Sequence, residues 1–190
     1  MTTKQPATLL IHPERAVPGG FRSLVPGTER ASTVLFENID KWKNRSGFDE
    51  SIYTYGTSGT PTTRDLQNRL AEWEGGFATV LFPSGLAAVA YAFLPFVAPG
   101  DHVLIPANVY DPVKTLANGL LKRMNVTVEQ YDPLIGAGIA AQIKPNTRLV
   151  WVETPGSITM EVSDLPAIAA AAHAAGALVA IDNTYSAGWY

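Results

Sequence analysis

Polar or aromatic residues follow four apolar segments of the chain, each close to the point where a predicted strand ends. In chain order, these residues are Ser84-Gly85, Tyr110, Ser157 and Asp182. The carboxyl ends of parallel strands meet at one edge of a sheet, and open α/β sheets bind their ligands at that edge. We therefore expect these positions to converge on one ligand site.

The turn Pro83-Ser84-Gly85 stands between an apolar segment and an apolar predicted helix. The first N–H groups of a helix lack acceptors within the helix, and the helix dipole adds positive potential, so an anion can bind there. Glycine at position 85 lets an anion approach the backbone because it carries no Cβ. Small residues also serve packing at such turns, so this stretch by itself is a weak phosphate signal.

Pyridoxal 5′-phosphate is the ligand whose chemistry fits this set of residues. Its phosphate needs N–H donors, its ring needs an aromatic face, and its ring nitrogen needs a carboxylate that keeps the cofactor an electron sink. Asp182 suits the last role because it follows the apolar run Leu178–Ile181. Structural alternatives exist for each residue: Tyr110 as a packing residue, Ser157 as a turn residue and Asp182 as a helix cap.

The region from residue 77 onward alternates short apolar strands with helices. The predicted strands are Thr79–Phe82, His102–Pro106, Val126–Tyr131, Arg148–Glu153 and Leu178–Asp182. The predicted helices are Leu86–Phe96, Pro112–Met124, Ile135–Ile143 and Leu165–Ala175. This alternation indicates βαβ units and an α/β fold with a mostly parallel sheet.

The region before residue 77 is less regular. Residues 1–30 are interrupted by Pro and Gly, and we expect no independent domain there. Further along the chain we expect a short strand at Ser32–Phe36, a helical turn at 38–43 and a hydroxyl-rich loop at 51–63. A helix is expected over Arg64–Glu74, capped by Thr62 or Thr63 and ended by Gly75-Gly76.

Composition excludes several classes of function. The chain has 190 residues, 46% of them hydrophobic, and a formal net charge of −3, which argues for a globular core and against a general nucleic-acid binder. It has no cysteine, and none of its three histidines has metal-ligand spacing, so we expect no metal site. The apolar run Ala167–Ala175 is too short to span a bilayer and no signal peptide is evident, so the cytoplasm is the expected compartment.

Several longer motifs resemble the Cys/Met-metabolism family of fold-type I pyridoxal phosphate enzymes. They are Tyr55–Thr62, Glu74–Gly76, Phe82–Ala88, Pro99–Val103, Tyr110, Tyr131–Gly136, Glu153–Glu161 and Asp182–Thr184. The resemblance covers almost the whole chain and implies a three-layer sandwich, incomplete here and preceded by an irregular segment. It also implies an N-terminal arm with an inter-subunit loop at 1–60 and a partial cofactor-binding large domain at 61–190.

The resemblance assigns a role to each candidate residue. Gly85 and Leu86 match the backbone N–H pair that holds the cofactor phosphate, and Tyr110 matches the tyrosine stacked on the cofactor ring. Asp182 matches the carboxylate on the ring nitrogen, and Ser157 lies where relatives often have an Asn near the phenolic oxygen. Tyr55 matches a tyrosine that reaches the phosphate of the neighbouring subunit, which implies a homo-oligomer built as a dimer of dimers.

Two features depart from the family pattern. Thr57 stands where the family loop has an arginine on the neighbour's phosphate, and Arg64 is a conceivable substitute. The Schiff-base lysine is expected beyond Tyr190, because none of the six lysines present matches its family position. These six are Lys4, Lys41, Lys43, Lys114, Lys122 and Lys144.

The resemblance implies β-elimination of cystathionine or a related thioether to give homocysteine, pyruvate and ammonia, with Tyr110 assisting proton transfer. The run Pro155–Glu161 favours this reaction over the γ-eliminating or γ-replacing branches, which remain the alternative within the family. A second alternative is a truncated chain without catalytic activity of its own. A Rossmann-type dinucleotide enzyme fits poorly because the turn at Ser84 lacks the glycine spacing of that fold.

Overall fold

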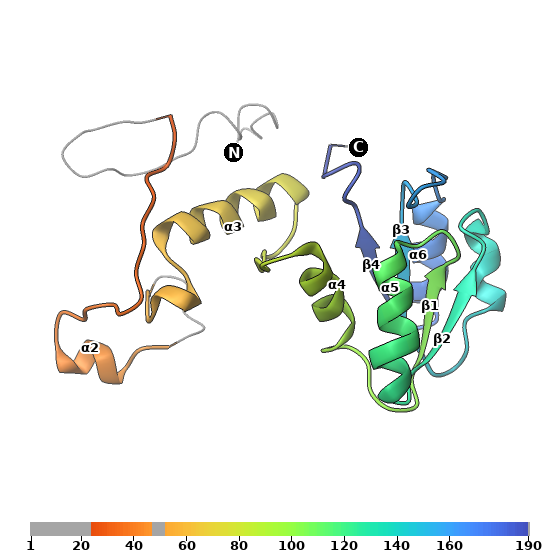
Figure 1. Ribbon diagram of the computed structural model, residues 1–190, viewed down its shortest axis with the longest axis horizontal. Helices are drawn as coiled ribbons and strands as arrows, with labels where there is room; N and C mark the ends of the chain where they lie inside the picture. The colour runs from red at the N-terminus through yellow and green to blue at the C-terminus, as the bar shows by residue number, and fades with distance from the viewer. Residues whose placement is uncertain (1–23, 47–51, 190) are drawn as a thin grey trace. The chain divides into compact units, whose positions relative to one another are not determined.

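Four short strands between residues 102 and 182 form a parallel sheet in the computed structural model, which describes residues 24–46 and 52–189. The strands are β1 (His102–Pro106), β2 (Thr127–Tyr131), β3 (Thr147–Glu153) and β4 (Leu178–Asp182). Their order across the sheet is β2-β1-β3-β4 (Figure 1). In the register of β3 and β4, Glu153 is paired with Asp182, so both strands end at the same edge.

Helical segments precede and connect these strands. They are α4 (Gly85–Phe93), α5 (Asp111–Leu116), the π-helix η3 (Ala117–Leu121), the 3₁₀-helix η4 (Gly136–Ala141) and α6 (Leu165–Ala174). The predicted helix Pro112–Met124 is present, but a π-helical turn around Gly119 interrupts it. The predicted helix Ile135–Ile143 is only the shorter η4, where two glycines disfavour a regular α-helix.

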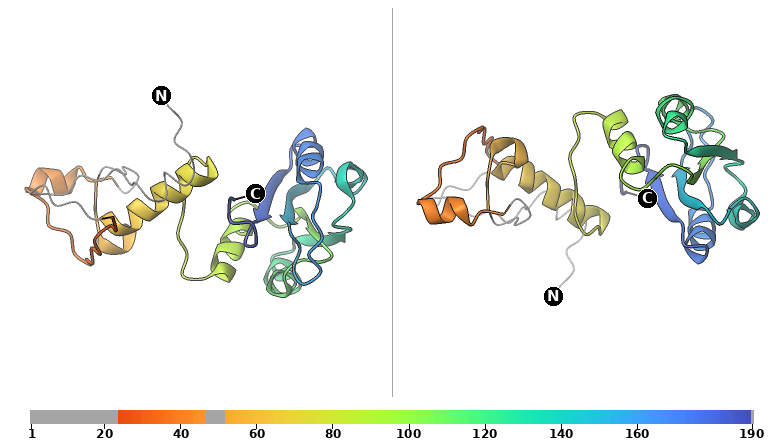
Figure 2. Two further views of the ribbon diagram at one scale, coloured as in Figure 1. Left: turned by 90° about the horizontal axis from the view of Figure 1, so that it is seen from above. Right: turned by 90° about the horizontal axis from the view of Figure 1, so that it is seen from below.

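Two separate hydrophobic cores cover the two faces of the sheet, because alternate residues of a strand point to opposite sides. Ile105 and Trp151 face a core completed by α4, α5 and η3. Leu104 and Val150 face the other core, completed by α6 and η4. Figure 2 shows α5 and α6 on opposite sides of the sheet. The predicted three-layer α/β architecture is confirmed, with all four strands parallel.

The structure separates into two units, residues 1–81 and residues 82–190, and the sheet belongs to the second. Within the first unit lie α2 (Ile39–Lys43), the 3₁₀-helix η2 (Gly56–Ser58) and α3 (Pro61–Glu74). The helical turn predicted at 38–43 is confirmed. The strand predicted at Ser32–Phe36 is wrong, because this segment makes only an isolated bridge between Thr33 and Tyr55. Of the segment 1–30, only residues 24–30 are described, and they form no helix or strand.

Helix α3 begins earlier than predicted, and its cap is Thr60 rather than Thr62 or Thr63. The side chain of Thr60 accepts from the N–H of Thr63, while Thr63 Oγ1 accepts from the N–H of Thr60. This reciprocal capping box, with Pro61 at the first helical position, outcompetes the later threonines. The predicted stop at Gly75 is confirmed, because Gly75 adopts a left-handed φ of 64°.

The segment Thr79–Phe82 was predicted as a strand, and this prediction is wrong. A strand needs a hydrogen-bonded neighbour, and none of the four strands in the sheet pairs with these residues. The helix start that follows at Gly85 is present all the same. None of the helices in residues 24–46 and 52–189 is long and apolar enough to cross a membrane.

Candidate functional site

A pocket of about 720 Å³ lies beside the last residues of β3 and β4. Five predicted site residues line it: Gly85, Leu86, Tyr110, Ser157 and Asp182. Every residue lining this pocket belongs to the unit formed by residues 82–190. The sixth predicted residue, Tyr55, belongs to the other unit, where its side chain is exposed.

The start of α4 supplies backbone donors to the pocket. Ser84 caps the helix, and its Oγ accepts from the N–H of Ala87 at 3.1 Å. Gly85 and Leu86 are the first two helical residues, so their N–H groups have no acceptor within the helix. A Cβ on Gly85 would meet no protein atom within 4 Å, and this residue lacks a left-handed φ. Protein packing therefore does not require glycine here, whereas an approaching anion would benefit from it.

Tyr110 stands between β1 and α5 and is held through its backbone. Its N–H donates to Oε2 of Glu153 at 2.8 Å, and its carbonyl accepts from the N–H of Val113 at 2.9 Å. The side chain is 46% exposed and lines the pocket. An aromatic face is thus available at the pocket, attached to a fixed point of the backbone.

Asp182 is the last residue of β4 and combines two roles. Its Oδ1 accepts from the backbone N–H of Thr184 at 3.0 Å and from the Thr184 hydroxyl at 2.5 Å. The structural alternative considered above was a helix cap, but Asp182 caps a turn, because no helix follows β4 in the described residues. A carboxylate has two oxygens and about four acceptor positions, so capping leaves Asp182 able to accept from a ligand in the pocket.

Ser157 lies in a tight loop after β3. Gly156 donates to the carbonyl of Glu161 at 2.9 Å and accepts from the N–H of Met160 at 3.1 Å. Ile158 and Met160 both adopt left-handed φ values, 67° and 59°, which are unusual for side chains of this kind. The loop is therefore strained and specific in shape, as loops at functional sites often are.

Asn108 joins this loop to the segment that carries Tyr110. Its Nδ2 donates to Oε2 of Glu161 at 2.8 Å. A Cβ on Gly156 would lie 1.9 Å from the same nitrogen, so only glycine lets Asn108 approach. The two loops at the ends of β1 and β3 are thus packed against each other.

Glu153 lines the pocket and had no role in the predicted set. It is 4% exposed and accepts a hydrogen bond from the backbone N–H of Tyr110, and the backbone N–H of Ser157 also favours its charged form. Burial raises the pKa of the Glu153 carboxyl, the charge of Asp182 raises it further, and the two backbone donors oppose the shift. The signal in the sequence is the two-residue period of β3, which places Glu153 on the same face as Leu149 and Trp151.

Trp151 was also missed, because it looks like an ordinary core residue of a buried strand. It is 3% exposed, and its ring stacks on that of Phe93 with centroids 4.9 Å apart. It lines the pocket, and its indole Nε1 is buried without a hydrogen-bond partner in the described part of the chain. A buried donor without a partner beside a pocket fits a site that receives a polar ligand.

Arg64, the conceivable substitute for the family's loop arginine, already has partners. Its Nη2 donates to the carbonyl of Ile52 at 2.6 Å, and its guanidinium lies 4.1 Å from the ring centroid of Tyr53. Arg64 therefore holds the segment before Tyr55 in place. Thr57, at the position of the expected arginine, is exposed in η2. Whether Arg64 also serves a phosphate stays a prediction.

A family model described as "Cys/Met metabolism PLP-dependent enzyme" matches residues 7–190. The chain belongs to this family. Pyridoxal 5′-phosphate is the family's cofactor, and the pocket residues fit it: free helical N–H groups, an aromatic face, a carboxylate and an open space at Gly85.

Relatives within the Cys/Met-metabolism family include cystathionine β-lyases of two bacteria. The chain is 40% identical to the Escherichia coli enzyme, covering 99% of this chain and 48% of that protein. It is 41% identical to the Haemophilus influenzae enzyme, covering 96% of this chain and 47% of that protein. The chain therefore spans about half the length of these relatives.

A solved structure of the same fold is that of cystathionine γ-lyase from Lactobacillus plantarum complexed with L-serine. It matches with a TM-score of 0.84 and 29% identity, over 98% of this chain and 46% of that one. The fold-type I assignment is thereby confirmed. Because β-lyases and a γ-lyase both match, the comparisons establish the family but do not decide between the two reactions.

Proposed function

We propose that this chain provides the cofactor contacts of a carbon–sulfur β-lyase that converts cystathionine to homocysteine, pyruvate and ammonia. The observation that carries the proposal is a pocket at the ends of β3 and β4 that brings together five of the residues predicted to bind pyridoxal phosphate. The names of the E. coli and H. influenzae relatives support cystathionine as the substrate. We further propose a cytoplasmic homotetramer, assembled as a dimer of dimers.

Each pocket residue has a binding or orienting task in this proposal. The N–H groups of Gly85 and Leu86 hold the phosphate, and the ring of Tyr110 stacks on the cofactor. Asp182 accepts a hydrogen bond from the protonated ring nitrogen, and Ser157 lies near the phenolic oxygen. Tyr55 reaches the phosphate of a neighbouring subunit.

When bound, the cofactor supplies an electron sink for the electrons of the substrate's Cα–H bond. The phenol of Tyr110, exposed toward the pocket, is the catalytic group of this chain and holds a proton close to the departing sulfur. We place the lysine that bonds the cofactor beyond Tyr190. None of the residues that line the pocket in the described chain is a lysine.

The test adds pyridoxal 5′-phosphate to the purified chain, records the visible spectrum before and after borohydride, and maps any modified peptide. We expect reversible binding and no stoichiometric adduct on any of the six lysines. Asp182→Asn should weaken binding about 10- to 100-fold, because it removes a charge-assisted hydrogen bond. Asp132→Asn is the matched control, since Asp132 caps a turn after β2 and does not line the pocket.

Identification of the keto acid formed from cystathionine separates the β-lyase from the γ-lyase alternative. Pyruvate from the full-length gene product is the expected result, whereas 2-oxobutyrate together with cysteine would identify a γ-lyase. The second candidate function, a non-catalytic cofactor-binding chain, predicts no keto acid from the 190 residues alone. Pyruvate from these 190 residues, or an adduct on one of the six lysines, would overturn the placement of the lysine beyond Tyr190.

A further inference from the structure

We propose that Glu153 is a positioning residue, whose buried carboxylate holds the Tyr110 segment in the place that the cofactor requires. This inference rests on the proposed function, because it assigns the residue that sets one of the proposed cofactor contacts. Glu153 is not itself assigned a contact with the reacting atoms.

The first reason is where its hydrogen bond goes. Glu153 is 4% exposed at the end of β3 and accepts from the N–H of Tyr110 at 2.8 Å, across 43 positions of sequence. Tyr110 and Glu153 both line the pocket. One carboxylate therefore connects the loop after β1 with the end of β3, where the loop of Ser157 begins.

The second reason is that the Tyr110 ring has little else to fix it. Its side chain is 46% exposed, so packing restrains the ring only partly. Helix α5 begins at the next residue, so the N–H of Tyr110 has no acceptor within that helix. The bond to Glu153 satisfies this donor and sets the backbone point from which the ring extends over the pocket.

The third reason is the strand register. Glu153 and Asp182 are paired residues of β3 and β4, and β3 lies between β1 and β4 in the sheet. The side chain of Glu153 is thus placed between the segment of Tyr110 and the carboxylate of Asp182. A second link between the same two loops, from Asn108 to Glu161 at 2.8 Å, involves residues that do not line the pocket. Of these two links, the one made by Glu153 lies at the pocket.

The experiment uses pyridoxamine 5′-phosphate, which has no aldehyde and so binds without a lysine. Its dissociation constant is measured by calorimetry for the 190-residue chain and for Glu153→Asp, Glu153→Gln and the control Asp132→Asn. Aspartate keeps the charge but withdraws the carboxylate by one methylene, so we expect about tenfold weaker binding from the loss of backbone anchoring. Glutamine keeps the reach and one acceptor oxygen, so it should restore part of the affinity. Asp132→Asn should bind as the parent does.

A double-mutant cycle tests whether Glu153 acts through Tyr110. In a Tyr110→Ala background the ring is gone, so Glu153→Asp should weaken binding only about twofold. The near-ultraviolet ellipticity of the bound probe reports ring placement, and we expect it to fall in Glu153→Asp while far-ultraviolet ellipticity is unchanged. If Glu153→Asp does not fold, the near-ultraviolet ellipticity of the bound probe is measured in Glu153→Gln instead.

The outcomes separate this inference from the proposed function. A parent chain that does not bind the probe would overturn the proposed cofactor site, and the role of Glu153 with it. A parent that binds, with Glu153→Asp binding equally well, would overturn the positioning role alone. Equal losses with and without the Tyr110 ring would show that Glu153 acts on something other than that ring, which also contradicts the inference.

Discussion

Two carboxylates at neighbouring strand ends have different surroundings and therefore different tasks. Glu153 is buried and accepts a hydrogen bond from the backbone N–H of Tyr110, so its task is to hold that segment. Asp182 is partly exposed, uses one oxygen to cap the turn at Thr184, and lines the pocket. A carboxylate is therefore structural at the end of β3 and available to a ligand at the end of β4.

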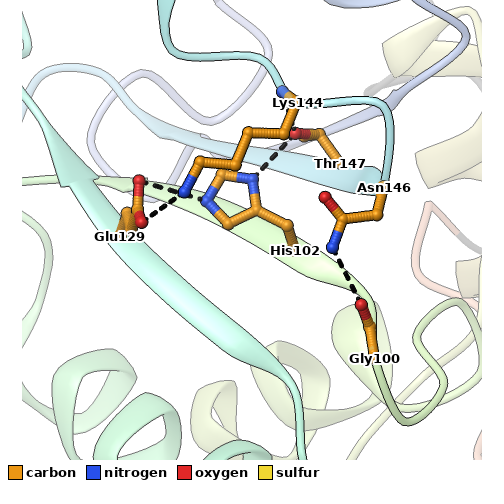
Figure 3. Close-up of polar contacts among 6 residues, drawn as sticks. All are labelled: Gly100, His102, Glu129, Lys144, Asn146 and Thr147. Atoms are coloured by element: carbon orange, nitrogen blue, oxygen red, sulfur yellow. Dashed lines mark hydrogen bonds and ion pairs between the residues drawn. The ribbon is translucent and has the colours of Figure 1, made fainter.

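Another group of polar residues lies at the opposite edge of the sheet, where β1 and β3 begin. His102 is buried, and its Nδ1 lies 2.7 Å from Oγ1 of Thr147 (Figure 3). Its Nε2 lies 3.5 Å from Oε2 of Glu129, which also pairs with Lys144. These contacts give His102 a structural role. Burial, followed by the charge of Lys144, lowers the pKa of His102, while Glu129 opposes the shift.

This lowered pKa predicts a pH dependence of stability. The folded protein favours neutral His102. The stability that this residue contributes is therefore present above the ordinary histidine pKa of 6.5 and is lost as the pH falls through the lower pKa of the folded state. The free energy of unfolding, measured in urea from about pH 7.5 to about pH 5.5, should therefore fall more steeply in the parent than in His102→Asn. The exposed His173→Asn is the control and should keep the parent's slope. Identical slopes for the parent and His102→Asn would contradict this assignment.

At the scale of elements, the loops after β1 and β3 behave as one packed pair. Asn108 occupies the space that a side chain at position 156 would need, and it reaches Glu161 from there. The left-handed conformations of Ile158 and Met160 require such external support, because they are unfavourable on their own.

Gly156→Ala should therefore destabilise the protein. The new Cβ would displace the Asn108 amide and break its hydrogen bond to Glu161, at a cost of about 1–3 kcal/mol. Gly119→Ala is the matched control, because its Cβ would meet no atom within 4 Å and it lies in the helical segment η3. That change should leave stability unchanged or raise it by about 0.5–1 kcal/mol. Urea unfolding measures both, and equal midpoints for the two variants would argue against the packed pair.

Local patterns predicted the elements that local forces decide. All four strands were predicted to within one residue. For β1 and β3 the reason is that uninterrupted apolar runs identify strands buried on both faces. The segment Thr79–Phe82 has the same apolar character but has no neighbouring strand, so it remains irregular. Strand formation depends on a partner that is distant in sequence, and the pattern of one segment does not contain that partner.

At the scale of the whole molecule, both hydrophobic cores are built within residues 82–190. The four strands of the sheet and the residues that line the pocket lie in the same range. The residues described in the first unit include many exposed apolar side chains, among them Phe77 and Leu35. The second unit therefore contains what a folded α/β domain needs.

We accordingly expect residues 82–190 to fold when produced alone. Hydrogen exchange should show the amides of β1 and β3 as protected in this shorter chain as in residues 1–190, because the same two cores cover them. Peptides of the irregular segment 24–36 serve as the fast-exchanging reference. Rapid exchange throughout β1 and β3 of the shorter chain would show that the first unit is needed to complete the fold.

The sequence by itself determined the α/β class, the helix start at Ser84-Gly85 and the convergence of Tyr110, Ser157 and Asp182 on one pocket. These follow from residue periodicity and from the rule that parallel strands end at a common edge. Only the tertiary structure decided that Glu153 reaches the N–H of Tyr110 and that Asn108 fills the space beside Gly156. Both contacts join segments more than forty residues apart. They depend on strand order and register, which the packing of two cores sets and which no local pattern contains.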